Sequence, residues 1–488
     1  MFSFADSFDL YATSADAING YWDSGTTAGL TLGTGRFTGS KAINMTVGTG
    51  FTKSSGTNDA VHHLVISIEQ TTALSGTTNV SWLELFDGTT AQCTIVFKSN
   101  GDIVLASGGP TGTVLDTYTG AVAAANTWYA FEIEVVINNS AGSWAVRKNG
   151  NTSNDHSLGS LDTQNSVNAY ANKLQLGCNS NSFSQWLDDL FWRSDASSVA
   201  WLGDIRCYTR MPASDASVQF SRTPTSNTQS PVTVSTTGAI TLGVGRYTAF
   251  TASYDGAVGA AAVSLGTGYT GNLKCSIFAS SGTAPTTVLG SATVVVNPAT
   301  GSNAITFGTP VAVSKGTTYY IGFDSDTSSG TWSVASGTTG LTSTTAYASF
   351  PAASPTTSAA AAIVCSLTIT LGGNYAAVDE PQEDATTSYV YDSTAGDVDF
   401  YGIASIASTP ATTIAVTTRG YMQKSDSGSR TAAVQIKSGG TTVASSTVTL
   451  TSTGWQWAWR MDLTDPNTST AWTPSGVNSA TIGPKTVA

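Results

Sequence analysis

The sequence predicts an all-β, multi-domain protein whose parts are jelly-roll or β-sandwich modules. Only 11% of its 488 residues are charged, and glycine alone contributes 49 residues. Threonine and valine favour strands and glycine favours turns, whereas long charged residues favour the solvated faces of helices. Many segments alternate apolar and polar residues with the two-residue period of a strand, and no long segment has the apolar period of a helix.

The N-terminal part of the chain has the clearest strand patterns. Phe131, Ile133, Val135 and Ile137 alternate with smaller or polar neighbours, which is typical of a strand with one buried and one wet face. Asp-Gly and Asn-Gly pairs, which tolerate positive φ in tight hairpins, separate several of these segments. Strands are expected at Ile43–Val47, Val61–Glu69, Val80–Phe86, Ala91–Phe97, Ile103–Ala106, Thr127–Ile137, Trp144–Lys148 and Lys173–Gly177.

A hairpin is expected at the end of this first module. Trp186–Trp192 reads as a strand, Ser194–Ser198 as a polar turn and Val199–Tyr208 as the returning strand, followed by the exit at Pro212. The composition changes after this hairpin, because 221–231 is polar with proline near each end. We therefore place the first domain boundary there.

The length allows roughly three domains of about 150 residues each. The predicted domains are a sandwich over 1–224, a small β-sandwich over 225–371 with a carbohydrate-binding-like character, and a β-rich C-terminal domain over 372–488. The middle domain is the poorest in charge and has its own strand patterns, such as Leu273–Ala279 and Thr318–Asp324.

Six segments of the first domain form an ordered set: Phe8–Tyr11, Gly108–Leu115, Ala125–Val135, Gly142–Gly150, Asp188-Asp189 and Leu202–Arg206. On these segments the domain resembles a concanavalin A-like or laminin-G-like jelly roll, in the form found in structural proteins of tailed bacteriophages. The C-terminal domain is similar to the last part of the same phage proteins, at Tyr389–Tyr391, Ile414–Met422 and Asp465–Thr473. In those relatives it follows the first domain directly, so the resemblance implies that 225–371 is an inserted module.

The net charge of −12 and the pI near 4.5 argue against nucleic-acid binding, since no Lys/Arg cluster is present to hold phosphates. The N-terminal segment lacks the pattern of a signal peptide, and no apolar run reaches membrane-spanning length. The expectation is a protein assembled in a host cytoplasm, without membrane insertion.

Paired carboxylates invite a catalytic interpretation. Glu132 and Glu134 lie two apart on one strand, so both point to the same face, as glycoside hydrolysis would need. The neighbouring positions of that face are Ala130 and Val136, so the third acid of the laminarinase-type pattern is missing. We expect Glu132 and Glu134 on the wet face of an amphipathic strand.

Metal and thiol sites have weaker support. Asp188 and Asp189 are adjacent and should face opposite sides, and one of them could hold Ca²⁺, as in some laminin-G-like domains. No second acidic cluster completes that shell, so no cofactor is predicted. His62 and His63 should also face opposite sides, and His156 is expected in a polar loop. The widely spaced cysteines, Cys93, Cys178, Cys207, Cys275 and Cys365, are expected to be buried free thiols.

Trp455, Trp457 and Trp459 alternate and should place three indoles on one side of a strand. Such a row is either a core or subunit-interface stripe or a platform on which sugars stack. Both interpretations stay open at this point.

The resemblance, with which the low charge and the strand-rich composition agree, implies a non-enzymatic structural protein of a tailed-phage virion, exposed on the head or the tail as a decoration, fibre or spike. Its expected partners are other capsid or tail proteins, further copies of itself with a trimer favoured, and host-surface glycans bound weakly through lectin-like modules. The alternatives are a glycan depolymerase or glucanase built on the first sandwich, and a secreted bacterial adhesin.

Overall fold

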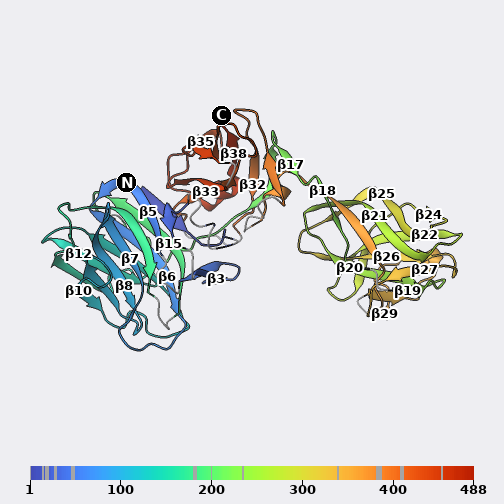
Figure 1. Cartoon of the computed structure of the whole chain (residues 1–488), viewed down its shortest axis with the longest axis horizontal. Helices are drawn as coiled ribbons and strands as arrows, with labels where there is room; N and C mark the ends of the chain where they lie inside the picture. The colour runs from blue at the N-terminus through green and yellow to red at the C-terminus, as the bar shows by residue number, and fades with distance from the viewer. Residues whose placement is uncertain are drawn as a thin grey trace.

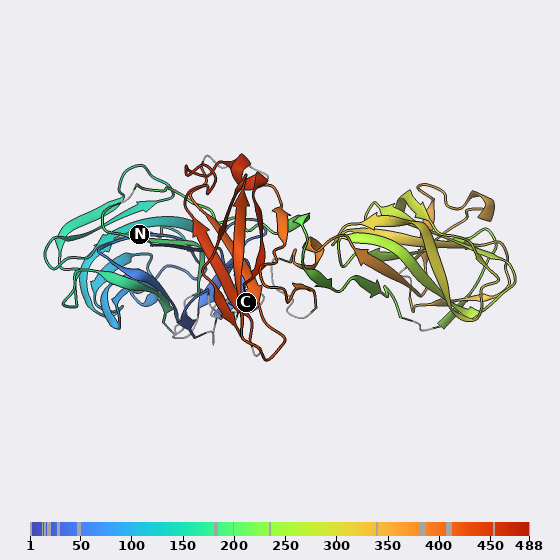
Figure 2. The same ribbon diagram turned by 90° about the horizontal axis from the view of Figure 1, so that it is seen from above.

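The computed structural model describes residues 2–487 apart from positions 12, 14–15, 17–20, 27–29, 46–49, 180–183, 199, 234–235, 338–339, 381–386, 407–411 and 452–453. It is built almost entirely from strands, which confirms the all-β, multi-domain prediction. Figure 1 shows three bodies, with the C-terminal domain between the N-terminal sandwich and the middle module, and Figure 2 shows the same order from above.

The N-terminal sandwich consists of two antiparallel sheets. The first has the order β13-β12-β11-β6-β15-β4-β3, with β1 also paired to β15. Its strands are β1 (Phe2–Asp6), β3 (Leu30–Thr34), β4 (Lys41–Met45), β6 (Val61–Gln70), β11 (Trp128–Val136), β12 (Gly142–Lys148), β13 (His156–Leu161) and β15 (Gln185–Asp195). The second sheet has the order β10-β9-β8-β7-β14-β5-β2. Its strands are β2 (Ser24–Gly25), β5 (Gly50–Asp59), β7 (Asn79–Asp87), β8 (Thr90–Lys98), β9 (Ile103–Ser107), β10 (Thr113–Tyr118) and β14 (Ala171–Cys178).

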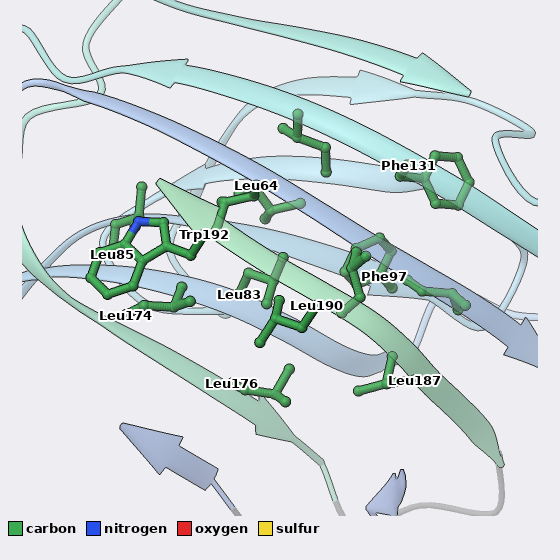
Figure 3. Close-up of a cluster of buried hydrophobic side chains, with 14 of the residues drawn as sticks. Leu64, Leu83, Leu85, Phe97, Phe131, Leu174, Leu176, Leu187, Leu190 and Trp192 are labelled. Carbon is green, nitrogen blue, oxygen red and sulfur yellow. The ribbon is translucent and has the colours of Figure 1, made fainter. Parts of the chain in front are cut away.

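The core of this sandwich is filled by alternate residues of its strands, as the alternation of Phe131, Ile133, Val135 and Ile137 predicts. Figure 3 shows side chains from both sheets pointing into one interior, including Leu64, Phe131 and Trp192 from the first sheet and Leu83, Phe97 and Leu176 from the second. Burial of each such side chain contributes about 1.5–3 kcal/mol, which makes this continuous cluster the main stabilising feature of the sandwich.

The middle module is a second sandwich with its own core. One sheet has the order β18-β30-β21-β27-β19 with β25 on β21, and the other β23-β22-β26-β20-β28-β29 with β24 on β22. The first sheet contains β18 (Ser226–Gln229), β19 (Thr236–Ala239), β21 (Gly256–Thr267), β25 (Gly301–Val313), β27 (Thr331–Val334) and β30 (Cys365–Leu371). The second contains β20 (Gly245–Thr251), β22 (Asn272–Ser280), β23 (Pro285–Ser291), β24 (Val295–Val296), β26 (Thr318–Ser325), β28 (Gly340–Ser343) and β29 (Thr357–Ala360), and the 3₁₀ turn η2 (Tyr347–Ser349) precedes β29.

The two ends of the middle module lie side by side. Its first strand, β18, pairs with its last, β30, so that Ser226 is opposite Thr370. The strand before the module, β17 (Ser221–Thr223), pairs with β31 (Tyr389–Tyr391). In the sequence, β31 follows the module and the 3₁₀ turn η3 (Tyr375–Ala377). We refer to the β17–β31 ribbon and the segments next to it as the neck. The chain therefore leaves toward the middle module and returns from it at one place.

The C-terminal domain combines a sheet with a two-stranded ribbon. The sheet has the order β16-β32-β38-β34-β35 with β36 on β34, and the ribbon is β33–β37. The strands are β16 (Pro212–Ser217), β32 (Phe400–Ile403), β33 (Val416–Met422), β34 (Arg430–Ser438), β35 (Thr441–Ala444), β36 (Val448–Leu450), β37 (Gln456–Asp462) and β38 (Thr481–Thr486). The short helix α1 (Pro474–Ser479) is capped by Thr473, whose side chain accepts a hydrogen bond from the Gly476 N–H.

The predicted closing hairpin of the first module is only half correct. Its first strand is β15, but residues 200–208 form no strand. They run instead across the outer face of the first sheet and lead into β16, which pairs with β32 of the C-terminal domain. The polar contacts described below hold this segment, so its apolar residues pack on a sheet face instead of extending a sheet. Val47 and Val199, each at the end of a predicted strand, lie outside the described residues.

Candidate functional site

The three tryptophans predicted to share one face line the β33–β37 ribbon. Trp457 is paired opposite Tyr421 in this antiparallel ribbon, and directly opposed residues lie on the same face. Trp455, just before β37, stacks on Tyr421 with ring centroids 5.5 Å apart, and Tyr421 stacks on Trp457 at 4.6 Å. Trp459 follows two residues later on the same face. The result is a row of aromatic rings along one side of the ribbon.

Two of these tryptophans pack against the N-terminal sandwich. Trp457 is 6% exposed, and its indole N–H donates a hydrogen bond of 2.9 Å to the Asp16 carbonyl. The Trp459 ring contacts Tyr21 edge-on with a centroid distance of 5.4 Å, and the Lys53 ammonium lies 4.7 Å from its centroid. Trp457 and Trp459 therefore pack in a contact between two parts of one chain, as residues of a core stripe do.

A buried ion pair lies at the centre of this interface. The Arg419 guanidinium of β33 donates to the Asp6 carboxylate of β1 at 3.0 Å, and the two side chains are 7% and 0% exposed. Arg419 also lies over the Tyr21 ring, 3.3 Å from its centroid. Asp6 accepts further hydrogen bonds from the Phe8 N–H, the Tyr11 hydroxyl and the Trp22 indole N–H. Hydrogen-bond donors from both the N-terminal sandwich and the C-terminal domain thus contact the Asp6 carboxylate.

A groove of about 880 Å³ runs beside the outer part of the aromatic row. It lies between β37 and the segment Ala444–Val448, and its aromatic wall is formed by Trp455 and Trp459, which are half-buried, with the buried Trp457 between them. Hydroxyl and amide side chains of Ser445, Thr451 and Gln456 line it. Its volume is in the range of small-molecule sites. An aromatic wall among hydroxyl and amide groups is suited to binding sugars, whose apolar faces stack on aromatic rings.

A second groove, in the middle module, has a different character. It measures about 530 Å³ and is lined by Asn227–Pro231 together with residues of β20 and its exit. The aromatic residue next to it, Phe250, is only 4% exposed, so it offers no platform. Gln229 uses its amide to hold Ser253 and the Thr251 carbonyl. This groove therefore lacks an aromatic wall, and its Gln229 amide is already engaged.

The expectation that Glu132 lies on a wet face is wrong. Its side chain does point away from the core, but it is 3% exposed because residues 200–205 cover it. Both of its oxygens are engaged: one by the Leu202 N–H and His63 Nε2, the other by the Gly203 N–H at 2.8 Å. Glu134 is half-buried and accepts a hydrogen bond from the Ser198 hydroxyl at 3.2 Å.

Residues 200–205, which we call the strap, are also fixed at two further points. Asp204 forms a bidentate ion pair with Arg36, with N–O distances of 2.5 and 2.6 Å. Ile205 is buried against Val65 and Phe191 on the outer face of the sheet. The strap is thus held by carboxylate contacts at 202–204 and by an apolar contact at its end, Ile205.

The expectation that Asp188 and Asp189 face opposite sides is also wrong. The pairing of β15 with β6 slips between Asp188 and Phe191, and Asp189 has a φ of +52°, so this bulge turns both side chains away from the core. Asp188 accepts from the Arg36 N–H, and Asp189 accepts from the Cys207 N–H, each at 2.8 Å. Burial raises the pKa of Asp188 to about 7, with the charge of Asp189 adding to it, and burial raises that of Asp189 to about 6.

Asp188 and Asp189 were weak candidates for a Ca²⁺ site. Within the part of the chain that the structure describes, no group of three or more His, Cys, Asp or Glu residues is arranged to hold a metal ion. The nearest partners of the two carboxylates are donors, namely backbone N–H groups, the Ser40 and Ser67 hydroxyls and Arg36. Donors in these positions compete with a cation for the same oxygens.

The histidines differ in their surroundings. His62 and His63 face opposite sides as expected: His62 stacks on Trp192 inside the sandwich, and burial lowers its pKa to about 4. His156 lies on β13, not in a loop, where it stacks on Tyr118 and contacts Asp116 at 2.7 Å. All five cysteines are free, as expected, and four are buried while Cys207 is half-buried.

The sequence did not point to the residues that pack around the tryptophan row, nor to the strap. Arg419 and Tyr421 alternate on β33 as the tryptophans do on β37, and that matching two-residue spacing is the signal that could have paired the segments. Nothing in the sequence connects Arg419 with Asp6, which is far away in the chain. The strap was missed because Leu202 and Ile205 have the apolar character expected of a strand.

No protein-family model matches the chain, and no curated protein matches it. Among solved structures it is similar to domain 4 of AbnA, a GH43 extracellular arabinanase from Geobacillus stearothermophilus, in complex with arabinotriose. The identity is 18% over 41% of this chain and 96% of that one, with a TM-score of 0.26.

Two further structures show the same level of likeness. The catalytic domain of a glycoside hydrolase family 131 protein from Coprinopsis cinerea is 16% identical over 42% of this chain and 98% of that one, with a TM-score of 0.28. The VIP36 exoplasmic/lumenal domain, in a Ca²⁺/Man3GlcNAc-bound form, is 7% identical over 35% of this chain and 84% of that one, with a TM-score of 0.25. TM-scores this low carry no functional inference.

In the described residues, no helix has the length and apolar character needed to cross a bilayer.

Proposed function

We propose that this chain is a non-enzymatic surface protein of a tailed-phage virion that adheres weakly to host-surface glycans through the groove beside Trp455. The observation that carries the adhesive part is the groove itself: a half-buried aromatic wall, stacked on Tyr421, among hydroxyl and amide side chains. The virion part rests on the resemblance of the first and last domains to phage structural proteins. Symmetric display of several copies, a trimer being favoured, would turn weak binding into useful avidity.

The state of the carboxylates supports a role without catalysis. A general acid or nucleophile for glycoside hydrolysis needs a carboxyl group that can reach the substrate. Glu132 has both oxygens engaged under the strap, and Asp188 and Asp189 are buried beside Arg36. None of these groups lines the two grooves described above.

The enzymatic alternative has a direct test. We expect the purified full-length chain to release no reducing ends from host polysaccharide, and Glu132→Gln to leave that result unchanged. Release of reducing sugar by the wild-type chain, lost in Glu132→Gln and in Glu134→Gln, would establish a depolymerase and overturn the proposal.

Adhesion can be tested with a matched pair of variants. Trp455→Ala removes the half-buried aromatic side chain of the groove, and Tyr391→Ala removes an exposed aromatic side chain at the neck, outside the groove. We expect Trp455→Ala to weaken binding of the full-length chain to host cells by about tenfold and Tyr391→Ala to leave it unchanged. Equal binding by Trp455→Ala and wild type would exclude the groove as the adhesive site.

The virion location has a separate test. Mass spectrometry of purified particles should detect the chain in stoichiometric amounts, and antibody labelling should place it on the particle exterior. Its absence from purified particles would remove the virion role and favour the secreted adhesin, which leaves the groove experiment unaffected.

A further inference from the structure

The charges around the groove restrict the class of sugar that it accepts. We infer, on the basis of the proposed glycan adhesion, that the groove takes neutral pyranose oligosaccharides and discriminates against acidic ones such as uronic or sialic acids. The inference concerns the groove's selectivity and rests on three features of its lining.

The first feature is Arg460, the only charged side chain among the described residues that line the groove. Its guanidinium forms a bidentate pair with Asp462 two residues along β37, through Nε at 2.7 Å and through Nη2. Nη1 donates to the Ala444 carbonyl. All three nitrogens of the guanidinium are therefore engaged, and its charge is balanced by Asp462, so a ligand carboxylate finds no unpaired cation there.

The second feature is the polar lining that remains. The Gln456 amide makes no hydrogen bond to any described residue, and it can both donate to and accept from a sugar hydroxyl. Ser445 and Thr451 contribute hydroxyl groups, whose own hydrogen bonds go to the nearby backbone. Amide and hydroxyl groups match the alternating donors and acceptors of a neutral sugar.

The third feature is the aromatic wall, and the charge of the whole chain acts in addition to it. Trp455 rests on Tyr421, so its indole is held in place as a flat platform that a pyranose ring can cover. The chain carries a net charge of −12, which repels an anionic ligand at low ionic strength. Stacking favours all pyranoses alike, whereas charge selects the neutral ones.

The test uses the full-length chain on a glycan array that holds neutral and acidic oligosaccharides, followed by calorimetry with the strongest ligand of each class. We expect the strongest ligands to be neutral, to lose about tenfold in affinity in Trp455→Ala, and to bind equally at 50 and 500 mM NaCl. Trp455-dependent binding that prefers acidic sugars, or that weakens steeply with salt, would overturn the selectivity while leaving adhesion intact. Absence of any Trp455-dependent binding would overturn adhesion and, with it, this inference.

One variant should reverse the selectivity. Asp462→Asn removes the carboxylate that pairs with Arg460. The backbone carbonyl of residue 462, which accepts a hydrogen bond from the Trp472 indole N–H, stays in place. We expect this variant to gain about threefold in affinity for hexagalacturonate relative to the neutral ligand. Unchanged relative affinities in a variant whose thermal unfolding matches the wild type would contradict the role given to the Arg460–Asp462 pair. If the variant does not fold, the salt dependence of the wild-type chain decides the question.

Discussion

The C-terminal domain is attached to its two neighbours in different ways. Against the N-terminal sandwich it buries Trp457 and the Arg419–Asp6 ion pair, and Trp457 belongs to the same apolar cluster as the sandwich core. Toward the middle module it has the neck, with a short strand pair, a small apolar cluster around Tyr254 and Leu371, and the partly exposed ion pairs of Lys315 with Asp379 and Glu380. Figure 2 shows the thin connections that join the middle module to the rest of the chain.

This difference indicates which parts depend on each other. Removing one partner of a buried ion pair leaves the other charge without compensation, whereas an exposed pair exchanges its partner for water at little cost. The groove lies beside the tryptophans of the buried joint, so its shape depends on the N-terminal sandwich. The middle module, with a separate core and adjacent ends, should be thermodynamically independent of both.

The largest effect is expected at the centre of the buried joint. Arg419→Met leaves the Asp6 carboxylate, 1% exposed, without its cation, and should cost about 3–5 kcal/mol of unfolding free energy. Urea unfolding of the full-length chain, followed by tryptophan fluorescence, measures this. A loss below about 1 kcal/mol would show that the joint does not depend on the ion pair.

A smaller loss is expected at the edge of the same joint. Trp457→Phe keeps an aromatic ring but removes the indole N–H that donates to the Asp16 carbonyl, and should cost about 1–2 kcal/mol. The same urea titration applies, and Trp455→Phe serves as the control because Trp455 lies outside the contact with the sandwich. Equal destabilisation by the two variants would argue against a special role of Trp457 in the joint.

Asp188 and Asp189, on the face of the N-terminal sandwich that the strap covers, should make the unfolding free energy depend on pH. The pKa values of Asp188 and Asp189 are raised to about 7 and about 6, so the folded chain keeps protons that the unfolded chain, near 3.8, releases. These two carboxyls should therefore lower the unfolding free energy as pH rises from about 4 to about 7, by about 1–2 kcal/mol after allowance for their coupling. His62, whose pKa is lowered to about 4, contributes in the opposite direction over the same range. Asp188→Asn should flatten this slope, and an unchanged slope would exclude Asp188 as its source.

The neck offers the counterpart of the Arg419 experiment. Lys315→Met removes the cation from two partly exposed ion pairs and should cost at most about 1 kcal/mol. The comparison of Lys315→Met with Arg419→Met is thus a matched test of the two joints. Similar losses in both would remove the distinction drawn between them.

The smallest effect is expected from removing the middle module altogether. Because Ser226 and Thr370 are paired, a short Gly-Gly link in place of 225–371 should leave the thermal midpoint of the remaining chain within a few degrees of the wild type. Differential scanning calorimetry gives the result directly. Loss of cooperative unfolding in the shortened chain would show that the module supports the other two parts.

The sequence allowed the fold class and most strands of the N-terminal sandwich to be predicted, because alternation such as Phe131-Ile133-Val135 depends on local burial alone. It also identified the tryptophan row. It did not predict that Glu132 is buried, because the cover comes from the strap, which has the composition of a strand. Nor did it predict the bulge at Asp189, since a slip in register is decided by packing across strands. Contacts between distant segments, such as Arg419 with Asp6, leave no local pattern.

Hydrogen–deuterium exchange of the full-length chain, with and without a saturating neutral oligosaccharide selected from the array, tests the location of the adhesive site most directly. We predict new protection in 454–462 and 444–448, with the rest of the chain unchanged. Protection confined to 227–231 and 249–253 in the middle module, or around Glu132 in the N-terminal sandwich, would contradict the assignment of the site to the groove beside Trp455.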